Sequence, residues 1–111
     1  MNVIKMLFGG NGISPSEVEP RLKDYYVLDV RQPEEFQIEH IDGAKLIPLN
    51  QLPKKLGTLP RDKEILCVCR SGSRSGAAVR HLTGAGYKAV NLSGGIVAWR
   101  RAGLPLKKGK K

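Results

Sequence analysis

Short apolar runs, separated by amphipathic and polar segments, extend over most of this chain. The runs at residues 25–30 and 65–69 predict buried strands. The second run is unbroken, as in strands of a parallel sheet that is covered on both faces. Shorter strands are expected at residues 44–47 and 89–92.

Helices are expected between these strands. Ser14 or Ser16 can cap the first helix, and Gly84 or Gly86 can end the helix that follows the unbroken strand. The segments with helix-forming residues or helical spacing lie at residues 14–23, 31–36, 49–56, 75–83 and 96–102. Strands that alternate with helices indicate an α/β fold with a mostly parallel sheet.

Length and composition limit the architecture to one soluble domain. The chain has 111 residues, of which 41% are hydrophobic and 26% charged. A chain of this length has room for one packed core, and these proportions are typical of a globular protein.

The net charge of +9 bears on which classes of partner the protein binds. Four of the lysines, at positions 107, 108, 110 and 111, form a basic end that is typical of a solvated tail. The chain has only three tyrosines, two phenylalanines and one tryptophan, so we expect no basic and aromatic surface for nucleic acid. A positive surface favours small anions or an acidic protein partner.

The cysteine and histidine positions exclude other classes of site. Cys67 and Cys69 are separated by one residue, which disfavours a disulfide between them and suits a reducing compartment. These cysteines and the distant His40 and His81 lack the spacing of metal ligands, so no metal or other cofactor is expected. Residues 3–8 are too short for a signal peptide or a membrane span, and we therefore expect a cytoplasmic protein.

The segment from Cys69 to Ser75 carries the candidate chemistry. It lies where the unbroken strand ends and a helix rich in small residues begins, which is the edge of a parallel sheet at which ligands bind. A loop of small residues there can turn several backbone N–H groups toward one point, and the helix adds positive potential. The sequence therefore predicts an anion-binding cradle formed by Arg70, Ser71, Gly72, Ser73, Arg74 and Ser75.

Cys69 is the candidate nucleophile. The amides, the helix and the two arginines should lower its pKa below the ~8.5 of an ordinary thiol and favour the thiolate. The alternative is that Cys69 only fills the end of a buried strand. Cys67 lies within the strand among apolar residues and is interpreted as a core residue, with a resolving or second sulfur-accepting thiol as the alternative.

The segment at residues 68–75, VCRSGSRS, resembles the active-site loop of rhodanese-like domains. Further segments that resemble the family follow in its order, at residues 29–31, 34–36, 40–44, 47–48, 92–95, 98–99 and 102–105. Together they predict an N-terminal extension at residues 1–12, a rhodanese-like domain at residues 13–105 and a basic C-terminal tail at residues 106–111.

The resemblance implies a three-layer sandwich with a five-stranded parallel sheet in the order 1-5-4-2-3 and helices on both faces. The strand that ends at Asp29 would then lie beside the one that ends at Cys69. Asp29 would then be a candidate partner for Arg74 or for loop amides. Arg31 would be a candidate to hold the neighbouring chain segment in place. The alternative is that Asp29 and Arg31 only stabilise the fold, a role that we also assign to Trp99 and to the turn at residues 94–95.

The resemblance also implies a thiosulfate sulfurtransferase. Cys69 would take a sulfur atom from a small anionic donor such as thiosulfate and pass it from a persulfide to cyanide, a thiol or a protein acceptor. Arg70, Arg74 and the amides of residues 71–75 would bind the donor and the leaving group.

Two other interpretations stay open at the level of the sequence. Cysteine phosphatases and arsenate reductases also place a cysteine and an arginine around an anion, but they need a longer loop than the four residues between Cys69 and Arg74. A non-enzymatic module for protein docking or sulfide sensing is the second alternative, although such modules usually lack the cysteine that this chain retains.

Overall fold

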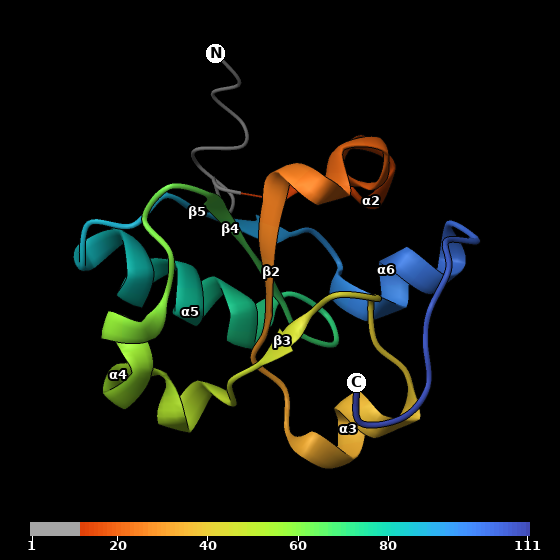
Figure 1. The fold of residues 1–111 in the computed structure, drawn as a ribbon. Helices are drawn as coiled ribbons and strands as arrows, with labels where there is room; N and C mark the ends of the chain where they lie inside the picture. The colour runs from red at the N-terminus through yellow and green to blue at the C-terminus, as the bar shows by residue number, and fades with distance from the viewer. Residues whose placement is uncertain (1–11) are drawn as a thin grey trace.

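A computed structural model describes residues 12–111 as one parallel sheet with helices on both faces (Figure 1). Within these residues the sheet has five strands in the order β1-β5-β4-β2-β3, and every neighbouring pair is parallel. The strands are β1 (Gly12–Ile13), β2 (Tyr25–Asp29), β3 (Lys45–Leu46), β4 (Glu64–Val68) and β5 (Ala89–Leu92). The predicted fold class and strand order are confirmed.

Five α-helices and three 3₁₀ turns connect these strands within the described residues. The helices are α2 (Pro15–Val18), α3 (Pro33–Ile38), α4 (Leu52–Lys55), α5 (Ser73–Gly84) and α6 (Gly95–Arg101). The 3₁₀ turns are η1 (Glu19–Asp24), η2 (Leu49–Gln51) and η3 (Leu56–Thr58). The predicted helices at residues 14–23 and 49–56 are thus divided into short α-helical and 3₁₀ pieces. Each division lies near a proline, Pro20 or Pro53, which cannot donate the next helical hydrogen bond.

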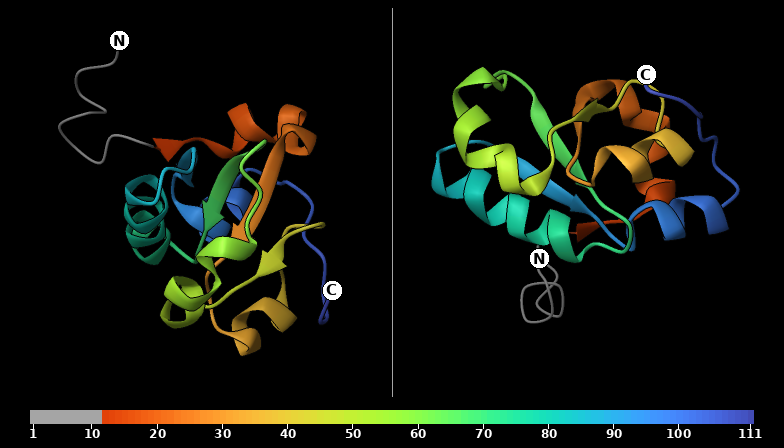
Figure 2. Two further views of the ribbon diagram at one scale, coloured as in Figure 1. Left: turned by 60° about the vertical axis from the view of Figure 1, so that its left-hand side comes forward. Right: turned by 90° about the horizontal axis from the view of Figure 1, so that it is seen from below.

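Side chains of the central strands alternate between two apolar layers. Ile65, Cys67 and Cys69 pack on one face with residues of α4 and α5, whereas Leu66 and Val68 pack on the other face with residues of α2 and α6. Figure 2 shows these helices on opposite sides of the sheet. Burial on both faces explains why the strand at β4 is apolar without interruption.

The basic C-terminal end is part of the fold. Lys107 and His40 exchange two backbone hydrogen bonds of 2.7 and 2.8 Å, and the Gly109 amide donates to the Gln37 carbonyl oxygen at 2.9 Å. The Lys107 ammonium also lies 3.5 Å from Asp42. The lysine side chains of this end are exposed, as expected for a solvated tail, but its backbone is bound to the fold. The carbonyl groups at the end of α3 have no partner within the helix, and the Gly109 amide supplies a donor to one of them.

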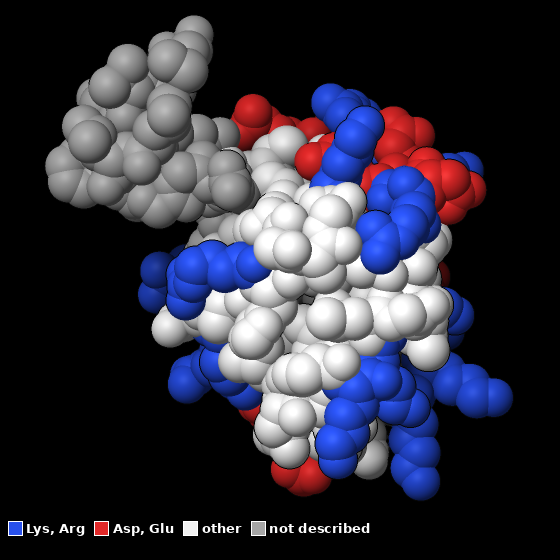
Figure 3. Space-filling view, turned by 90° about the vertical axis from the view of Figure 1, so that its left-hand side faces the viewer, with Lys and Arg blue, Asp and Glu red and all other residues white. Residues whose placement is uncertain are grey.

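The predicted N-terminal extension at residues 1–12 lies outside the described residues except for Gly12, which belongs to β1. None of the helices in residues 12–111 is both long and apolar enough to cross a bilayer. Figure 3 shows the side of the molecule that carries α5, where Lys and Arg side chains occupy several separate parts of the surface.

Candidate active site

The candidate nucleophile lies at the junction of β4 and α5. Cys69 follows the last residue of β4, and α5 begins four residues later at Ser73. The segment at residues 69–75 is here called the cysteine loop. In the register of the sheet, Asp29 at the end of β2 lies opposite Val68 of β4. Parallel strands end at the same edge, so the cysteine loop and the polar segment after β2 lie side by side.

The cysteine loop turns hydrogen-bond donors toward the sulfur of Cys69. The Gly72 amide donates to Sγ at 3.0 Å, and the Ser75 hydroxyl lies 3.2 Å from it. Burial by itself raises the pKa of this thiol, but hydrogen bonds from the Ser75 hydroxyl and from the amides of Ser75, Gly72 and Ser71 outweigh burial and lower the pKa. Cys69 is only 1% exposed, so the loop covers the sulfur that it stabilises.

Two glycines give the cysteine loop its path. Gly72 has φ +108°, a conformation that favours glycine, and it caps the N-terminus of α5 while its amide faces Cys69. Gly95 has φ +59° and packs directly on the start of the loop, where a Cβ atom would collide with the carbonyl oxygens of Cys69 and Arg70. The next two amides of α6 donate to these carbonyl groups at 3.0 and 3.1 Å. The packing role expected for the turn at residues 94–95 is thus a contact with the cysteine loop itself.

Asn91 joins the site from β5, although the sequence did not predict it there. Its Nδ2 donates to the Gly72 carbonyl oxygen at 2.9 Å, and its Oδ1 lies 2.5 Å from the Ser75 hydroxyl. The single hydroxyl proton of Ser75 therefore has two acceptors, Asn91 and the sulfur of Cys69. The one feature of the sequence that could have indicated this role is that Asn91 is polar, whereas the other residues of its short strand are apolar.

The two arginines of the cysteine loop differ in their surroundings. Arg74 donates both Nη atoms to the Glu35 carboxylate at 2.7 and 2.8 Å, an ion pair that links α5 to α3. The hydrogen bond from Arg74 is the main reason why the pKa of Glu35 falls from 4.5 to about 2, so Glu35 is ionised and available to Arg74 at neutral pH. Arg70 is exposed and has no carboxylate within ion-pair distance among residues 12–111. In the sequence, Glu35 was noted only as part of the segment at residues 34–36 that resembles the family.

Asp29 and Arg31 form a buried ion pair with each other. The Arg31 Nη2 and Nε atoms donate to the Asp29 carboxylate at 2.7 and 2.9 Å, and Nη2 also donates to the Glu39 carbonyl oxygen at 2.8 Å. Arg31 therefore ties the end of β2 to the end of α3. Of the two candidate partners of Asp29, Arg74 or loop amides, neither forms a hydrogen bond to it among the described residues: Arg31 binds Asp29, and Glu35 binds Arg74.

Cys67 is fully buried two residues before Cys69, and both cysteines are free thiols. Burial, and then the neighbouring Cys69, raise the pKa of Cys67 to about 12. A buried thiol with this pKa is protonated at neutral pH and is a poor nucleophile. These surroundings favour the interpretation of Cys67 as a core residue.

Replacing Ser75 with alanine is expected to raise the pKa of Cys69. The variant removes one donor to the sulfur and keeps the amides, so the pKa should rise by about one unit, because a hydrogen bond to a charged group contributes roughly 1.5 kcal/mol or more. Fewer thiolates are then present below that pKa, and the midpoint of the rate of alkylation by iodoacetamide should move to higher pH. Ser73→Ala, at an exposed position that makes no side-chain hydrogen bond to the sulfur, is the matched control. An unchanged midpoint in Ser75→Ala would contradict the role of the hydroxyl.

The sequence of this chain is similar to one known protein family and to relatives with related names. The sequence matches the family described as "Rhodanese-like domain" over residues 14–102. A protein of Allochromatium vinosum named sulfurtransferase is 36% identical over 100 residues, which cover 86% of this chain and 94% of that protein. The putative sulfurtransferase YtwF of Bacillus subtilis is 40% identical over 77 residues, which cover 69% of this chain and 75% of that protein.

Solved structures give the same result for the fold. A rhodanese-related protein from Thermoplasma volcanium superposes with a TM-score of 0.85 at 36% identity, covering 87% of this chain and 97% of the other. A rhodanese-like domain protein from Staphylococcus aureus has a TM-score of 0.78 at 34% identity, covering 88% and 99% of the two chains. By its sequence and its fold, this chain belongs to the family of rhodanese-like domains.

Proposed function

We propose that this protein is a sulfurtransferase that carries a sulfur atom on Cys69 as a persulfide, with thiosulfate as the donor. The observation that carries the proposal is the set of hydrogen-bond donors around Sγ of Cys69. These donors lower the pKa of a cysteine that lies just before the N-terminus of α5. Relatives named as sulfurtransferases support sulfur transfer as the general chemistry.

The first step is attack by the Cys69 thiolate on the outer sulfur of thiosulfate. A bond forms between Sγ and that sulfur, the S–S bond of the donor breaks, and the bonding electron pair leaves with sulfite. The persulfide that remains carries one negative charge on its terminal sulfur. The amides that stabilise the thiolate can stabilise this anion in the same way.

The second step returns the enzyme to its starting state. A thiolate of the acceptor attacks the terminal sulfur, a new S–S bond forms on the acceptor, and the Cys69 thiolate leaves with the electron pair of the bond that breaks. Dividing the transfer into two displacements is ordinary covalent catalysis. Neither step changes the net charge or needs a further oxidant or reductant.

Arg70 is the cation of the cysteine loop that is available to an anionic donor. It is exposed, whereas the charge of Arg74 is already paired with Glu35. We assign Arg74 to positioning of the loop against α3, and we assign the amides of Ser71, Gly72 and Ser75 to binding of the sulfur anion. Because Cys69 is 1% exposed, we expect the cysteine loop to move when a donor or acceptor reaches the sulfur.

A mass measurement tests the function and separates it from the two alternatives. Purified protein is incubated with thiosulfate and then with a thiol, and its mass is measured after each step. An enzyme gains one sulfur atom on the peptide that contains Cys69 and loses it to the thiol. No adduct would support a docking or sensing module and contradict the proposal, as would hydrolysis of an aryl phosphate in place of sulfur transfer.

A further inference from the structure

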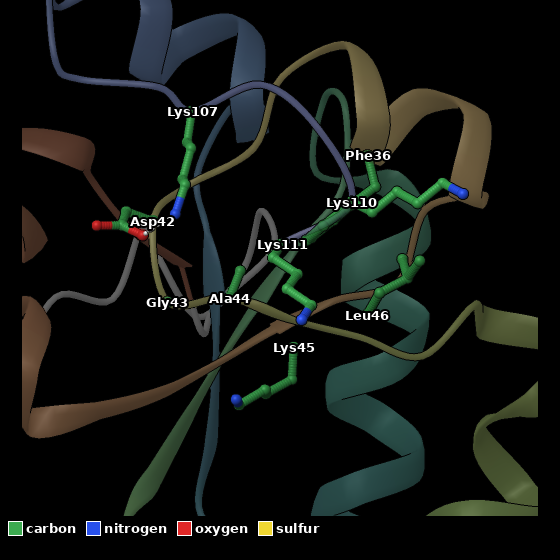
Figure 4. Close-up of a pocket in the computed structure, with 9 residues that line it drawn as sticks. All are labelled: Phe36, Asp42, Gly43, Ala44, Lys45, Leu46, Lys107, Lys110 and Lys111. Carbon is green, nitrogen blue, oxygen red and sulfur yellow. Dashed lines mark ion pairs between the residues drawn. The ribbon is translucent and has the colours of Figure 1, made fainter.

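A cavity of about 430 Å³ lies between α3, β3 and the C-terminal end of the chain (Figure 4). Four of the nine residues that line it are lysines: Lys45, Lys107, Lys110 and Lys111. Its apolar part comes mainly from Phe36, Ala44 and Leu46. A second cavity of about 320 Å³ shares Phe36, Leu46 and Lys110 with the first, so the two form a continuous depression along α3, here called the lysine groove.

The fold fixes the position of these lysines. The backbone of Lys107 pairs with His40, and the Gly109 amide binds the end of α3, so the last residues of the chain run along this helix. Lys45 belongs to β3, which is an edge strand of the sheet. The positive charge of the groove is therefore part of the tertiary structure and not that of a freely moving tail.

Most of this charge is not compensated by the protein. The one acidic residue that lines the cavity, Asp42, lies 3.5 Å from Lys107. Lys45, Lys110 and Lys111 have no carboxylate within ion-pair distance in the part of the chain that the structure describes. Three neighbouring unpaired cations repel one another, and an anionic partner relieves this repulsion.

The arrangement of the lysines favours a chain of separated carboxylates. Figure 4 shows their ammonium groups pointing in different directions around the cavity, so they do not converge on one small anion. Stacking of nucleic acid bases is also disfavoured, because Phe36 is 3% exposed and its ring already stacks on His40 at 3.7 Å. An acidic polypeptide segment with some apolar residues fits both the charges and the apolar floor.

The lysine groove is linked to the candidate active site through α3. Phe36, which lines both cavities, directly follows Glu35, and Glu35 holds Arg74 of the cysteine loop. We propose that the lysine groove docks an acidic segment of a protein partner that exchanges sulfur with Cys69. This inference rests on the proposed function and adds to it the chemical class of the partner.

The first experiment measures binding of an acidic peptide without sulfur transfer. Binding of a fluorescent glutamate-rich peptide is measured by anisotropy at low salt with the Cys69→Ser protein, which cannot transfer sulfur. Charge reversal of the three unpaired lysines, K45E/K110E/K111E, should weaken this binding by about tenfold or more, since each exposed charge contributes a modest amount. The matched control K54E/K55E/K88E changes the net charge equally at exposed positions outside the groove and should have a much smaller effect.

A second measurement relates docking to transfer. With the wild-type cysteine, the same peptide carrying a terminal cysteine should accept sulfur with a kcat/KM that falls by about tenfold in K45E/K110E/K111E. The rate with the neutral thiol 2-mercaptoethanol should stay unchanged, which shows that the variant is folded and active.

Three results would overturn the proposal: equal binding by wild type and K45E/K110E/K111E, an equal loss in the control variant, or tighter binding of a single-stranded oligonucleotide through the same lysines. Failure of the proposed function gives a different pattern. In that case neither thiol accepts sulfur, although the anisotropy measurement still reports whether the groove binds the acidic peptide.

Discussion

Replacing Cys69 with serine is expected to reduce sulfur transfer by at least about a thousandfold, because the variant removes both the proposed nucleophile and the proposed carrier of the persulfide. A serine hydroxyl is not ionised near neutral pH, and hydrogen bonds from Gly72 and Ser75 cannot make it so. The stability of the protein should change little, since the two side chains are similar in size. The measurement is the rate of sulfite release from thiosulfate with cyanide as the acceptor.

Cys67 provides the matched control for this variant. It lies in β4, two residues before Cys69, is fully buried and has its pKa raised to about 12. Cys67→Ala should therefore keep most of the activity and still gain one sulfur atom after treatment with thiosulfate. A loss comparable to that of Cys69→Ser would show that Cys67 takes part in the transfer and would contradict the assignment of a single nucleophile.

Replacing Gly95 with alanine is expected to have the second largest effect, on stability and activity together. The new Cβ would collide with the carbonyl oxygens of Cys69 and Arg70, so the start of α6 and the cysteine loop must move apart. The backbone at φ +59° adds a further cost for any residue with a Cβ. We expect a loss of about 2–4 kcal/mol in the free energy of unfolding, measured with urea, and a large fall in the rate of transfer.

Gly103→Ala separates the two causes of this loss. Gly103 also has a positive φ, of +74°, but a Cβ atom added there would meet nothing within 4 Å. Its replacement should cost only about 1 kcal/mol and leave sulfur transfer unchanged. If Gly95→Ala were as mild as Gly103→Ala, the close packing of α6 on the cysteine loop would not determine the geometry of the site.

The sequence by itself determined the α/β class, the two long strands and the identity of the candidate nucleophile. Local information is sufficient for these features, because a fully buried strand is apolar along its length and a loop rich in serine and glycine at its end has few other roles. The strand order came from resemblance to a family. The two-residue strands β1 and β3 are too short to give a periodic pattern of their own.

Only the tertiary structure decided which side chains surround the cysteine loop. Glu35 and Asn91 are separated from their partners Arg74 and Ser75 by 39 and 16 residues, and nothing local to either residue identifies such a partner. The same holds for the lysine end of the chain, whose composition indicated a solvated tail. It became one wall of a groove because α3 offers backbone carbonyls that the tail can reach, and the position of that helix depends on the fold of the whole sheet.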